Sequence, residues 1–475
     1  MRDALPTVED VRAIYFKAQR KKNIIPQHAN LTPRYNRKIL ELIESISLGT
    51  DPIADADKQT ELDKLLQVKK EYETQVFAGM RDALEARILR APTAIRLRYR
   101  QIGDRVVTVF NKNRPTLMLL DRFSALHLSR AFGIRPVGRD QCVRVLTNTF
   151  LISSGGSEAR QGVLKRDIQA FYGSIDHELL LAKVDGHAGV PRFVKQHVRA
   201  VVTAYARLHG ASRGIPDGVP SSAALAEIYL ENFDSAIRGN PEVALYVRYV
   251  DDIVIVTEPE RLTEISGQID KLLSKVKLTK NESKSQQLVH PMLPETSIDY
   301  LGYKFVFAEV TSKLTIIDLS DAKFKRYAEA FGRMSAFADA VECWSSLDSV
   351  DTYLAMFEYL FRPHATADVG HGMRIVTGLA YSGRFLRIDN KQHSNFGDLL
   401  TFARKEVGKR WGPMNKALAT GQVPQCGCCG RDIPRWTELE AVIAGAGVGF
   451  EVMGSAALPH VDEGLRIKVG RLLWS

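Results

Sequence analysis

The sequence predicts an α+β fold with a mainly antiparallel sheet, and three observations support this class. Residues 163–168, 245–250 and 253–257 form short apolar runs typical of strands, and helical patterns fill the chain between the first two runs. The last two runs are so close together that they must form a hairpin, which excludes a purely parallel sheet. Helical patterns also precede and follow this region, so helices are expected on both sides of the sheet region.

The bulk composition favours a large chain with an anionic partner. At 475 residues the chain is too long for one compact core, so two or more domains are expected. Lys and Arg number 65 against 55 Asp and Glu, and the formal net charge of +10 favours nucleic acid over a ribosomal or membrane surface. The charged N-terminus lacks the apolar core of a signal peptide, and no run is long enough to cross a bilayer. We therefore expect a soluble, cytoplasmic protein with no membrane partner.

The elements before the sheet region begin with a helical extension. Residues 1–90 carry an apolar period near that of a helix. Residues 105–110 and 116–120 are strand-like, and the turn-rich "NKNRP" between them predicts a hairpin. Lys112 and Arg114 would form the basic tip of that hairpin. Residues 91–310 are expected to form the central unit of the chain.

The elements after the sheet region are mainly helical over residues 311–415. Ser320 is a candidate N-cap, and the helix that follows it is basic. Residues 416–475 would form a small C-terminal extension.

Adjacent acids lie in the predicted hairpin turn, at Asp251 and Asp252. Acidic residues are common in turns, but the flanking strands are apolar, so this turn is held at a buried edge where repelling carboxylates need a cation. A divalent metal site needs a further acid from another strand, and Asp167 closes the run 163–168. Asp176 is better explained as a helix N-cap than as a ligand.

A loop rich in Gly and Pro, "GIPDGVPSS", lies between these acidic segments. It predicts a rigid turn that leads into a helix starting at Ser221 or Ser222. A helix N-terminus behind such a turn suits a nucleotide or a template backbone, although a turn with a cap is also an ordinary loop design.

Five segments in this order resemble the palm motifs of reverse transcriptases. "DIQAFYGSID" resembles motif A, "GIPDGVPSS" motif B, "YVDD" motif C, "NESKS" motif D and "YLGYKF" motif E. The pattern is similar to that of bacterial enzymes related to group II introns and retrons. The resemblance implies an RNA-directed DNA polymerase with a right-hand fold, made of fingers, a palm with an antiparallel sheet, and a helical thumb. It also implies two Mg²⁺ ions, with Mn²⁺ as an alternative.

The resemblance assigns a role to each matching position. The metal ligands would be Asp167, Ile168, Asp251 and Asp252. Lys284 would be a catalytic residue near the leaving pyrophosphate, and Tyr172 would exclude a ribose 2′-OH while Phe171 faces the core. Further contacts are expected with the incoming triphosphate (Lys112, Arg114), the nucleotide or template (Asp217, Gly218), the primer (Tyr300, Leu301, Gly302) and the duplex backbone (Lys323, Lys325, Arg326).

One position departs from the family pattern. Motif B usually has Gln where this chain has Asp217, which replaces a neutral group by an anion near the expected triphosphate. The change lowers affinity unless a cation or a hydrogen-bond donor pairs with the carboxylate. We expect Asp217 to alter nucleotide selection or templating rather than to abolish synthesis.

The cysteines do not predict a closed metal site. They are five in number and indicate no disulfide framework. Cys426 and Cys429 match half of a zinc knuckle and His460 is a candidate third ligand, but the sequence shows no fourth, so zinc is not expected.

The flanking segments indicate which kind of reverse transcriptase this is. Val-Thr-Gly at 376–378 lies far downstream of its place in retron enzymes. Neither the Asn-Ala-x-x-His element of retron enzymes nor the nuclease finger of intron proteins is visible. The layout is similar to stand-alone enzymes of antiphage defence. Expected partners are an RNA template, a DNA product, dNTPs, a dedicated non-coding RNA, and a second copy or second protein. The alternatives are a retron or intron reverse transcriptase, and a catalytically silent nucleic-acid-binding scaffold.

Overall fold

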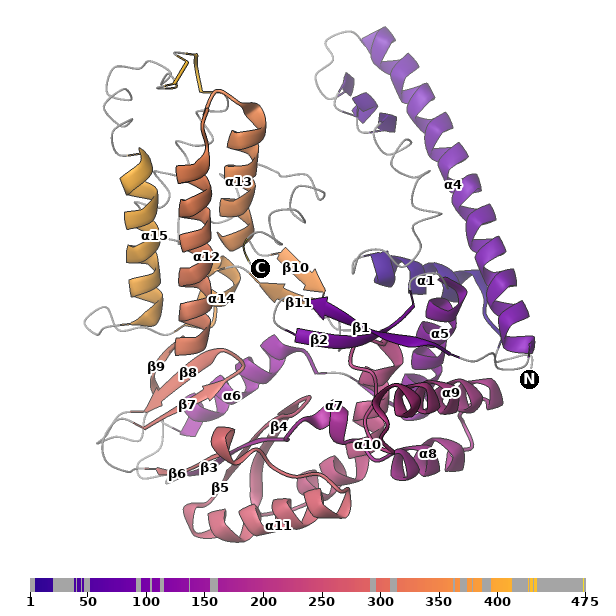
Figure 1. The fold of residues 1–475 in the computed structure, drawn as a ribbon, viewed down its shortest axis with the longest axis vertical. Coiled ribbons are helices and arrows are strands. Elements are labelled where there is room, and N and C mark those ends of the chain that lie inside the picture. The colour runs from indigo at the N-terminus through magenta and orange to yellow at the C-terminus, as the bar shows by residue number, and fades with distance from the viewer. Residues whose placement is uncertain are drawn as a thin grey trace.

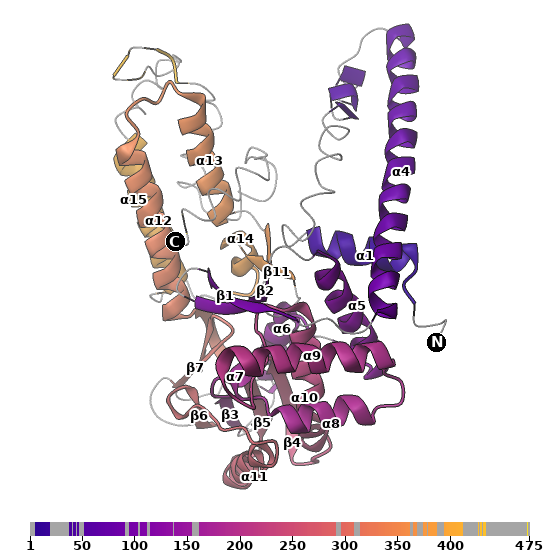
Figure 2. The same ribbon diagram turned by 45° about the vertical axis from the view of Figure 1, so that its right-hand side comes forward.

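The structure is a computed structural model that describes residues 5–19, 38–39, 41–43, 45–46, 52–90, 95–102, 105–111, 115–135, 137–153, 161–290, 296–307, 314–361, 364–367, 374–377, 379–386, 394–411, 426, 428–429, 431–433 and 473. Two upright helical arms rise from a base of sheets and shorter helices (Figure 1). One arm is the long helix α4, and the other contains α12, α13 and α15. The second view shows the same two arms on either side of the β1–β2 hairpin (Figure 2).

The N-terminal arm confirms the helical pattern in the part of residues 1–90 that is described. Its main helices are α1 (Val8–Gln19) and α4 (Pro52–Leu89). Phe77 and Leu84 of α4 pack in one apolar cluster with Val11 of α1 and Phe123 of the next helix. This cluster joins the foot of α4 to the rest of the molecule.

The hairpin predicted across "NKNRP" is wrong. The strands that pair are β1 (Leu97–Ile102) and β2 (Arg105–Phe110), and the run 116–120 lies in a helix. Pro115 occupies the first position of that helix, where its fixed φ and missing N–H are well tolerated. A short apolar run such as "TLMLL" fits a buried helix as well as a strand, which explains the error. The helices that follow are α5 (Pro115–Ala131) and α6 (Arg139–Ser153).

The central sheet has four antiparallel strands in the order β4-β5-β3-β6. This confirms the predicted antiparallel sheet and the predicted hairpin, which is formed by β4 and β5. Its strands are β3 (Gln161–Asp167), β4 (Val243–Tyr249), β5 (Asp252–Thr257) and β6 (Gln286–His290). The helical segments between them are α7 (Phe171–Ser174), α8 (His177–Gly186), α9 (Arg192–His209), α10 (Pro220–Arg238), η2 (Pro259–Arg261), α11 (Leu262–Lys275) and η3 (Glu282–Lys284).

Strand β5 is buried on both faces, which explains its unbroken apolar sequence. Ile253 and Ile255 belong to the cluster that includes α8, α9, α10 and α11, whereas Val254 and Val256 belong to the cluster on the other face, with α6. Side chains alternate between the faces of a strand, so one run of apolar residues supplies both cores. Each of these four side chains contributes about 1.5–3 kcal/mol by leaving water.

A second antiparallel sheet connects the central sheet to the C-terminal arm. Its strands are β7 (Thr296–Tyr300), β8 (Tyr303–Phe307) and β9 (Leu314–Leu319), in the order β7-β8-β9. The remaining elements are α12 (Asp321–Ala340), α13 (Leu347–Phe361), β10 (His364–Ala367), β11 (Arg374–Thr377), α14 (Leu379–Gly383) and α15 (Asn395–Trp411).

The start of the C-terminal arm follows the prediction. The Ser320 hydroxyl accepts a hydrogen bond of 3.3 Å from the backbone N–H of Lys323, so Ser320 is the N-cap of α12. Within the described part of the chain, no helix combines the length and the hydrophobicity needed to cross a membrane.

Candidate active site

Three aspartates meet where β3 ends and β5 begins. Asp167 and Asp252 are cross-strand partners, and Asp251 lies in the two-residue turn between β4 and β5. The backbone N–H of Ile168 donates to the carbonyl of Asp251 at 3.1 Å, which fixes the end of β3 to this turn. The Ile168 side chain is buried, so only its backbone carbonyl is available to a ligand. The structure therefore brings together the acids that the sequence predicts as metal ligands.

The turn that carries Asp251 has a strained backbone. Val250 has a φ of +62°, a left-handed conformation that a β-branched residue rarely adopts. Strain of this kind costs on the order of 1–3 kcal/mol and persists only where the surroundings hold it. The Arg248 guanidinium is part of what holds it, because its Nη1 donates to the Val250 carbonyl at 3.0 Å.

Arg248 is itself fixed by a buried network that the sequence analysis missed. Its guanidinium forms a bidentate pair with Asp234 at 2.8 and 2.6 Å, and it also contacts Glu227 at 3.1 and 2.6 Å. The Tyr246 hydroxyl donates to the same Asp234 carboxylate at 2.5 Å. An Arg alternating with apolar residues along a strand was the available signal, because a buried cation needs buried acids. The network joins α10 to the turn that carries Asp251.

Burial and mutual repulsion disfavour the ionised forms of Asp251 and Asp252 unless a cation is bound nearby. Burial, together with the charges of Asp252 and Asp167, raises the pKa of Asp251 to about 6. Burial also raises the pKa of Asp252, and the charge of Asp167 acts in the same direction. A nearby cation would reverse these shifts by favouring the ionised forms.

Lys284 lies beside this cluster. Its ammonium donates to Asp167 Oδ2 at 3.2 Å, while the lysine side chain remains 60% exposed. The backbone N–H of Asn281 donates to the Asp167 carbonyl at 2.7 Å, which seats the short helix η3 against the end of β3. The exposed ammonium can therefore reach both the carboxylates and a ligand above them.

The donor set fits divalent metal ions. Oxygen ligands from carboxylates and one backbone carbonyl are those that Mg²⁺ and Mn²⁺ prefer. The pKa values of Asp251 and Asp252 are raised by burial and by neighbouring carboxylates, although Lys284 acts in the opposite direction on both, so the cluster retains negative charge that a metal ion would stabilise. The residues suited to hold the ions are Asp167, Asp251, Asp252 and the carbonyl of Ile168.

The loop 214–220 packs tightly against the β1–β2 hairpin. Gly218 N–H donates to the carbonyl of Thr108 at 3.1 Å, and a methyl group at Gly218 would lie 2.5 Å from Val109 Cγ1. Gly214 has a φ of +92°, and a methyl group there would lie 2.5 Å from the Tyr205 ring. Both positions therefore need glycine for the loop to pass this close to its neighbours.

Asp217 has a hydrogen-bond donor that the sequence did not reveal. Its Oδ1 accepts a bond of 2.8 Å from the backbone N–H of Thr108 in β2. The carboxylate thus ties the loop 214–220 to strand β2 of the β1–β2 hairpin. The sequence analysis expects an acid at this position to need a cation or a hydrogen-bond donor, and the Thr108 N–H is that donor.

A buried carboxylate positions the helix that follows the loop. Asp121 of α5 is fully buried, and its two oxygens accept bonds from the Ser221 backbone N–H at 2.9 Å and the Ser221 hydroxyl at 2.6 Å. His197 of α9 contacts the same carboxylate at 2.9 Å. Asp121 thus supplies a carboxylate at the N-terminus of α10, where a negative charge is favourable. Its position 100 residues before Ser221 explains why sequence reasoning missed it.

Residues 133–305 match the family of reverse transcriptases, described as RNA-dependent DNA polymerases. The match spans the three aspartates, the loop 214–220 and Lys284. This region is a reverse transcriptase domain. A search of curated proteins finds no significant match.

Telomerases are among the solved structures similar to the chain. Telomerase from Candida albicans, in complex with a fragment of telomeric RNA, is 14% identical with a TM-score of 0.39, over 70% of this chain and 56% of that one. Telomerase from Candida tropicalis with an RNA fragment is 11% identical with a TM-score of 0.39, over 80% and 64%. An apo form from Candida tropicalis is 13% identical with a TM-score of 0.36, over 48% and 54%. This chain thus spans 54% to 64% of those telomerase chains, and likenesses this weak say nothing about activity.

The tight turn at the end of the reverse transcriptase domain joins β7 to β8. Leu301 and Gly302 have φ values of +49° and +79°, as a two-residue hairpin turn requires. Arg139 of α6 donates to the Leu301 carbonyl at 2.7 Å. Tyr300 and Leu301 are buried at 1% and 7% exposure, so both side chains belong to the core, and Gly302 is the less buried residue of the turn.

The three residues of α12 predicted to contact the duplex backbone differ in their surroundings. Lys325 and Arg326 are exposed, whereas Lys323 is partly buried with its ammonium 4.3 Å from the centre of the Tyr303 ring. Burial, with Arg139 and Arg326 nearby, lowers the pKa of Lys323 to about 7. Lys323 therefore lies beside the β7–β8 turn and is only partly charged near neutral pH.

The structure describes only some of the residues that were predicted to contact the nucleotide. Phe171 is buried at 3% exposure in the core, as predicted. Tyr172 is less buried but packs against the same apolar cluster, with its ring centroid 5.7 Å from that of Phe171, so the expectation that the two rings face opposite ways is wrong. The Tyr172 carbonyl accepts a bond of 2.8 Å from Ile215 N–H, which connects it to the loop 214–220. Lys112 and Arg114 lie outside the described residues.

Proposed function

We propose that this protein is an RNA-directed DNA polymerase that joins dNTPs by two-metal nucleotidyl transfer. The observation that carries the proposal is the meeting of Asp167, Asp251 and Asp252 at one edge of the sheet, inside a reverse transcriptase domain. Two of these acids have raised pKa values, and Lys284 lies beside the cluster.

In the proposed reaction, the primer 3′-OH attacks the α-phosphate of the dNTP. Asp167, Asp251 and Asp252, with the Ile168 carbonyl, would hold two Mg²⁺ ions, with Mn²⁺ as an alternative. When bound, such ions activate the hydroxyl and neutralise developing charge on the leaving group. Lys284 would move from Asp167 toward the leaving pyrophosphate, where its ammonium stabilises negative charge. Arg248 would keep the strained turn, and hence Asp251, in place.

The nucleotide side of the proposed site is formed by the loop 214–220 and Tyr172. Tyr172 would exclude a ribose 2′-OH, as the family resemblance implies. Asp217 would affect nucleotide selection through its bond to β2. Equal incorporation rates and an equal nucleotide preference in wild type and Asp217→Gln would contradict this role.

The nucleic-acid side of the proposed site follows the right-hand arrangement. We assign fingers and palm to residues 91–310, a thumb to 311–415, and extensions to 1–90 and 416–475. The turn at Leu301 and Gly302 would contact the primer. Lys323, Lys325 and Arg326 would contact the duplex backbone through its phosphates. We place the reaction in the cytoplasm, with an RNA template and a DNA product as partners, and assembly with a second copy or a second protein is part of the same hypothesis.

The polymerase proposal is tested by incorporation of labelled dNTPs on an RNA template with a DNA primer and Mg²⁺. Asp167→Ala and Asp251→Ala should each remove nearly all synthesis while circular dichroism stays that of the wild type. Asp176→Asn is a matched control, because Asp176 lies in the same segment but caps α8, and Asn is an equally good cap. Retained synthesis in either alanine variant would refute the proposal.

We further propose that the enzyme serves antiviral defence. The test is a plaque assay on bacterial cells challenged with phages. The support is the sequence layout, which lacks the retron and intron elements. Cells expressing the wild type should form fewer plaques than cells expressing Asp251→Ala. Nucleic acid that co-purifies with the protein would be sequenced to identify the template and any dedicated RNA. A structured RNA encoded beside the gene would instead indicate a retron, and a bound RNA without DNA synthesis would indicate a scaffold.

A further inference from the structure

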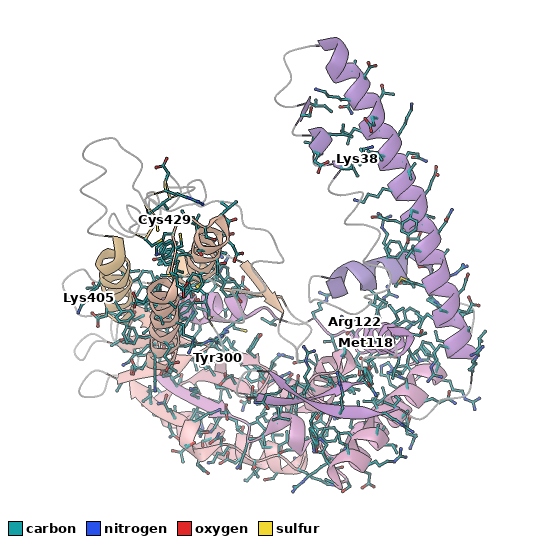
Figure 3. All side chains as sticks on the ribbon, turned by 45° about the horizontal axis from the view of Figure 1, so that its top comes forward. Lys38, Met118, Arg122, Tyr300, Lys405 and Cys429 are labelled. Atoms are coloured by element: carbon teal, nitrogen blue, oxygen red, sulfur yellow. The ribbon has the colours of Figure 1, made fainter. Side chains whose placement is uncertain are left out.

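Four cysteine thiols gather at the free end of the C-terminal arm. The sulfur atoms of Cys343, Cys426, Cys428 and Cys429 all lie within 4.8 Å of one another. Cys343 lies in the turn between α12 and α13, and the other three come from the "QCGCCG" segment. Cys429 lies at the tip of the arm, far from Tyr300 at its foot (Figure 3).

The sequence argument that zinc is not expected depended on finding no fourth ligand. Cys343 supplies that ligand, and it lies 83 residues before Cys426 in the chain. A lone cysteine inside a helical region gives no signal of metal binding, because the usual spacing patterns place ligands in close pairs. His460, the third ligand considered from sequence, lies outside the described residues.

Two of the sulfur separations match those around one tetrahedral metal ion. With bonds of about 2.3 Å to zinc, tetrahedral thiolates lie about 3.8 Å apart. The Cys343 sulfur lies 3.8 Å from that of Cys426 and 3.6 Å from that of Cys429. The sulfurs of Cys426 and Cys428 are 3.0 Å apart, which is well beyond the bond length of about 2.05 Å in a disulfide. The site is also too compact for an iron–sulfur cluster, whose thiolates bind separate irons.

Neighbouring groups are arranged as donors to the sulfurs. The Trp344 backbone N–H donates to Cys426 Sγ at 3.3 Å. The Ser345 hydroxyl lies 3.0 Å from the sulfur of Cys343 and 3.3 Å from that of Cys429. Hydrogen bonds of this kind around metal-binding thiolates orient the ligands and offset their charge.

The cluster also has a rigid support. Cys426 is buried at 4% exposure, and its backbone N–H donates to the Arg431 carbonyl at 2.8 Å. Cys426 and Ile433 belong to the same apolar cluster as Trp344, which packs edge-on against the Tyr353 ring of α13. The thiols of Cys426 and Cys343 are therefore held by this apolar cluster, against which Cys343 also packs. Cys428 and Cys429 are exposed and can adjust to a metal.

We propose that Cys343, Cys426, Cys428 and Cys429 bind one structural Zn²⁺ ion that ties the C-terminal segment to the α12–α13 turn. Four thiolates close the coordination sphere, which is typical of a structural site and leaves no position for a substrate. The ion would close a loop of 83 residues that spans α13, α14 and α15. The proposal is independent of the polymerase activity.

The first test is the metal content of the full-length protein, purified under reducing conditions without added chelator. We expect about one zinc per chain by mass spectrometry, with four sulfur ligands at about 2.3 Å by X-ray absorption. Iron in place of zinc, or failure of the reduced protein to retain zinc or to take it up from added Zn²⁺, would overturn the proposal. So would disulfides among these cysteines in freshly purified protein.

Two variants and one control make the test specific. Cys343→Ser and Cys428→Ser should each lower the zinc content at least fivefold and speed proteolysis within the C-terminal segment. Cys428 is exposed, so its replacement does not depend on refilling a packed site. Cys142→Ala replaces the one cysteine outside the cluster and should keep its zinc. Wild-type zinc content in Cys343→Ser or Cys428→Ser would refute the assignment.

Discussion

Replacing Arg248 by Met should weaken the fold and the catalytic turn together. The Arg248 side chain is 4% exposed and the Asp234 side chain is 7% exposed, so the substitution leaves a buried carboxylate without its main partner. Met fills a similar volume, which limits the effect of a cavity. The experiment therefore reports mainly on the lost charge and hydrogen bonds.

The expected magnitude follows from the contacts. Arg248 gives up its bidentate pair with Asp234, its pair with Glu227 and its bond to the Val250 carbonyl. Breaking a buried ion pair by removing one partner costs about 3–5 kcal/mol. The lower end is expected here, because Asp234 keeps the Tyr246 hydroxyl at 2.5 Å and Glu227 is 33% exposed. We expect a loss of about 3 kcal/mol in the free energy of unfolding.

The measurement is urea unfolding followed by circular dichroism, for Arg248→Met, Asp234→Asn and the double variant. The double variant removes the buried carboxylate of Asp234 and leaves only Glu227, which is 33% exposed, without its partner. Its destabilisation should therefore be smaller than the sum of the single effects, by roughly 1–3 kcal/mol. Arg238→Met is the matched control, since Arg238 contacts the same Asp234 at 3.8 Å but is 61% exposed, and it should cost less than about 1 kcal/mol. An Arg248→Met variant as stable as the control would refute the reasoning.

The same variant has a catalytic readout. Without the bond from Arg248, the Val250 carbonyl loses a donor and the strained turn can relax. We expect a lower kcat at a temperature where the variant is still folded, with little change in KM for the primer-template. Arg238→Met should retain the wild-type kcat.

Three further predictions concern the pH dependence and the packing of the site, with Gly267→Ala as the control for the third. The pKa of Asp251 is raised from 3.8 to about 6, so the folded state disfavours the ionised carboxylate, and the stability of the metal-free protein should fall as the pH rises from 3.8 to about 6. Asp251→Asn should therefore be more stable than wild type in EDTA at pH 7.5. Equal or lower stability of the variant would contradict the raised pKa. The lowered pKa of Lys323, about 7, means that phosphate binding draws a proton onto it, so primer-template affinity should be higher at pH 6 than at pH 8.5 by a margin that Lys323→Met reduces. Gly218→Ala places a methyl group 2.5 Å from Val109 Cγ1 and should cost about 1–3 kcal/mol and lower kcat/KM for dNTPs. Gly267→Ala, in open space on α11, should be neutral or stabilising by up to about 1 kcal/mol.

The sequence predicted the central sheet well because its signals are local. The run 253–257 has the apolar character of a buried strand, and the short link to 245–250 allows only a hairpin. The cap at Ser320 was equally local and is confirmed. The predicted hairpin at 105–120 failed because "TLMLL" fits either structure and only Pro115 marked the helix start.

Apart from the Arg248 network, the contacts of the candidate site and of the cysteine cluster that sequence reasoning missed are long-range. Asp121 contacts Ser221 across 100 residues, and Asp217 contacts Thr108 across 109. Cys343 meets Cys426 across 83 residues. Local patterns carry no information on such pairs, since each residue alone has an ordinary alternative as a surface acid or a buried thiol.

The two-sided burial of β5 sets which parts of this molecule can move during a catalytic cycle. A strand that packs against two cores cannot shift toward one without losing contacts with the other. Asp252 and the adjoining turn should therefore stay in place while other parts of the molecule move. The β1–β2 hairpin meets the loop 214–220 through two hydrogen bonds at Thr108 and through a small apolar cluster that contains Phe110 and Val219, outside the two cores that hold β5. Any closing around a nucleotide should therefore move the hairpin and the loop 214–220 together toward carboxylates that stay in place.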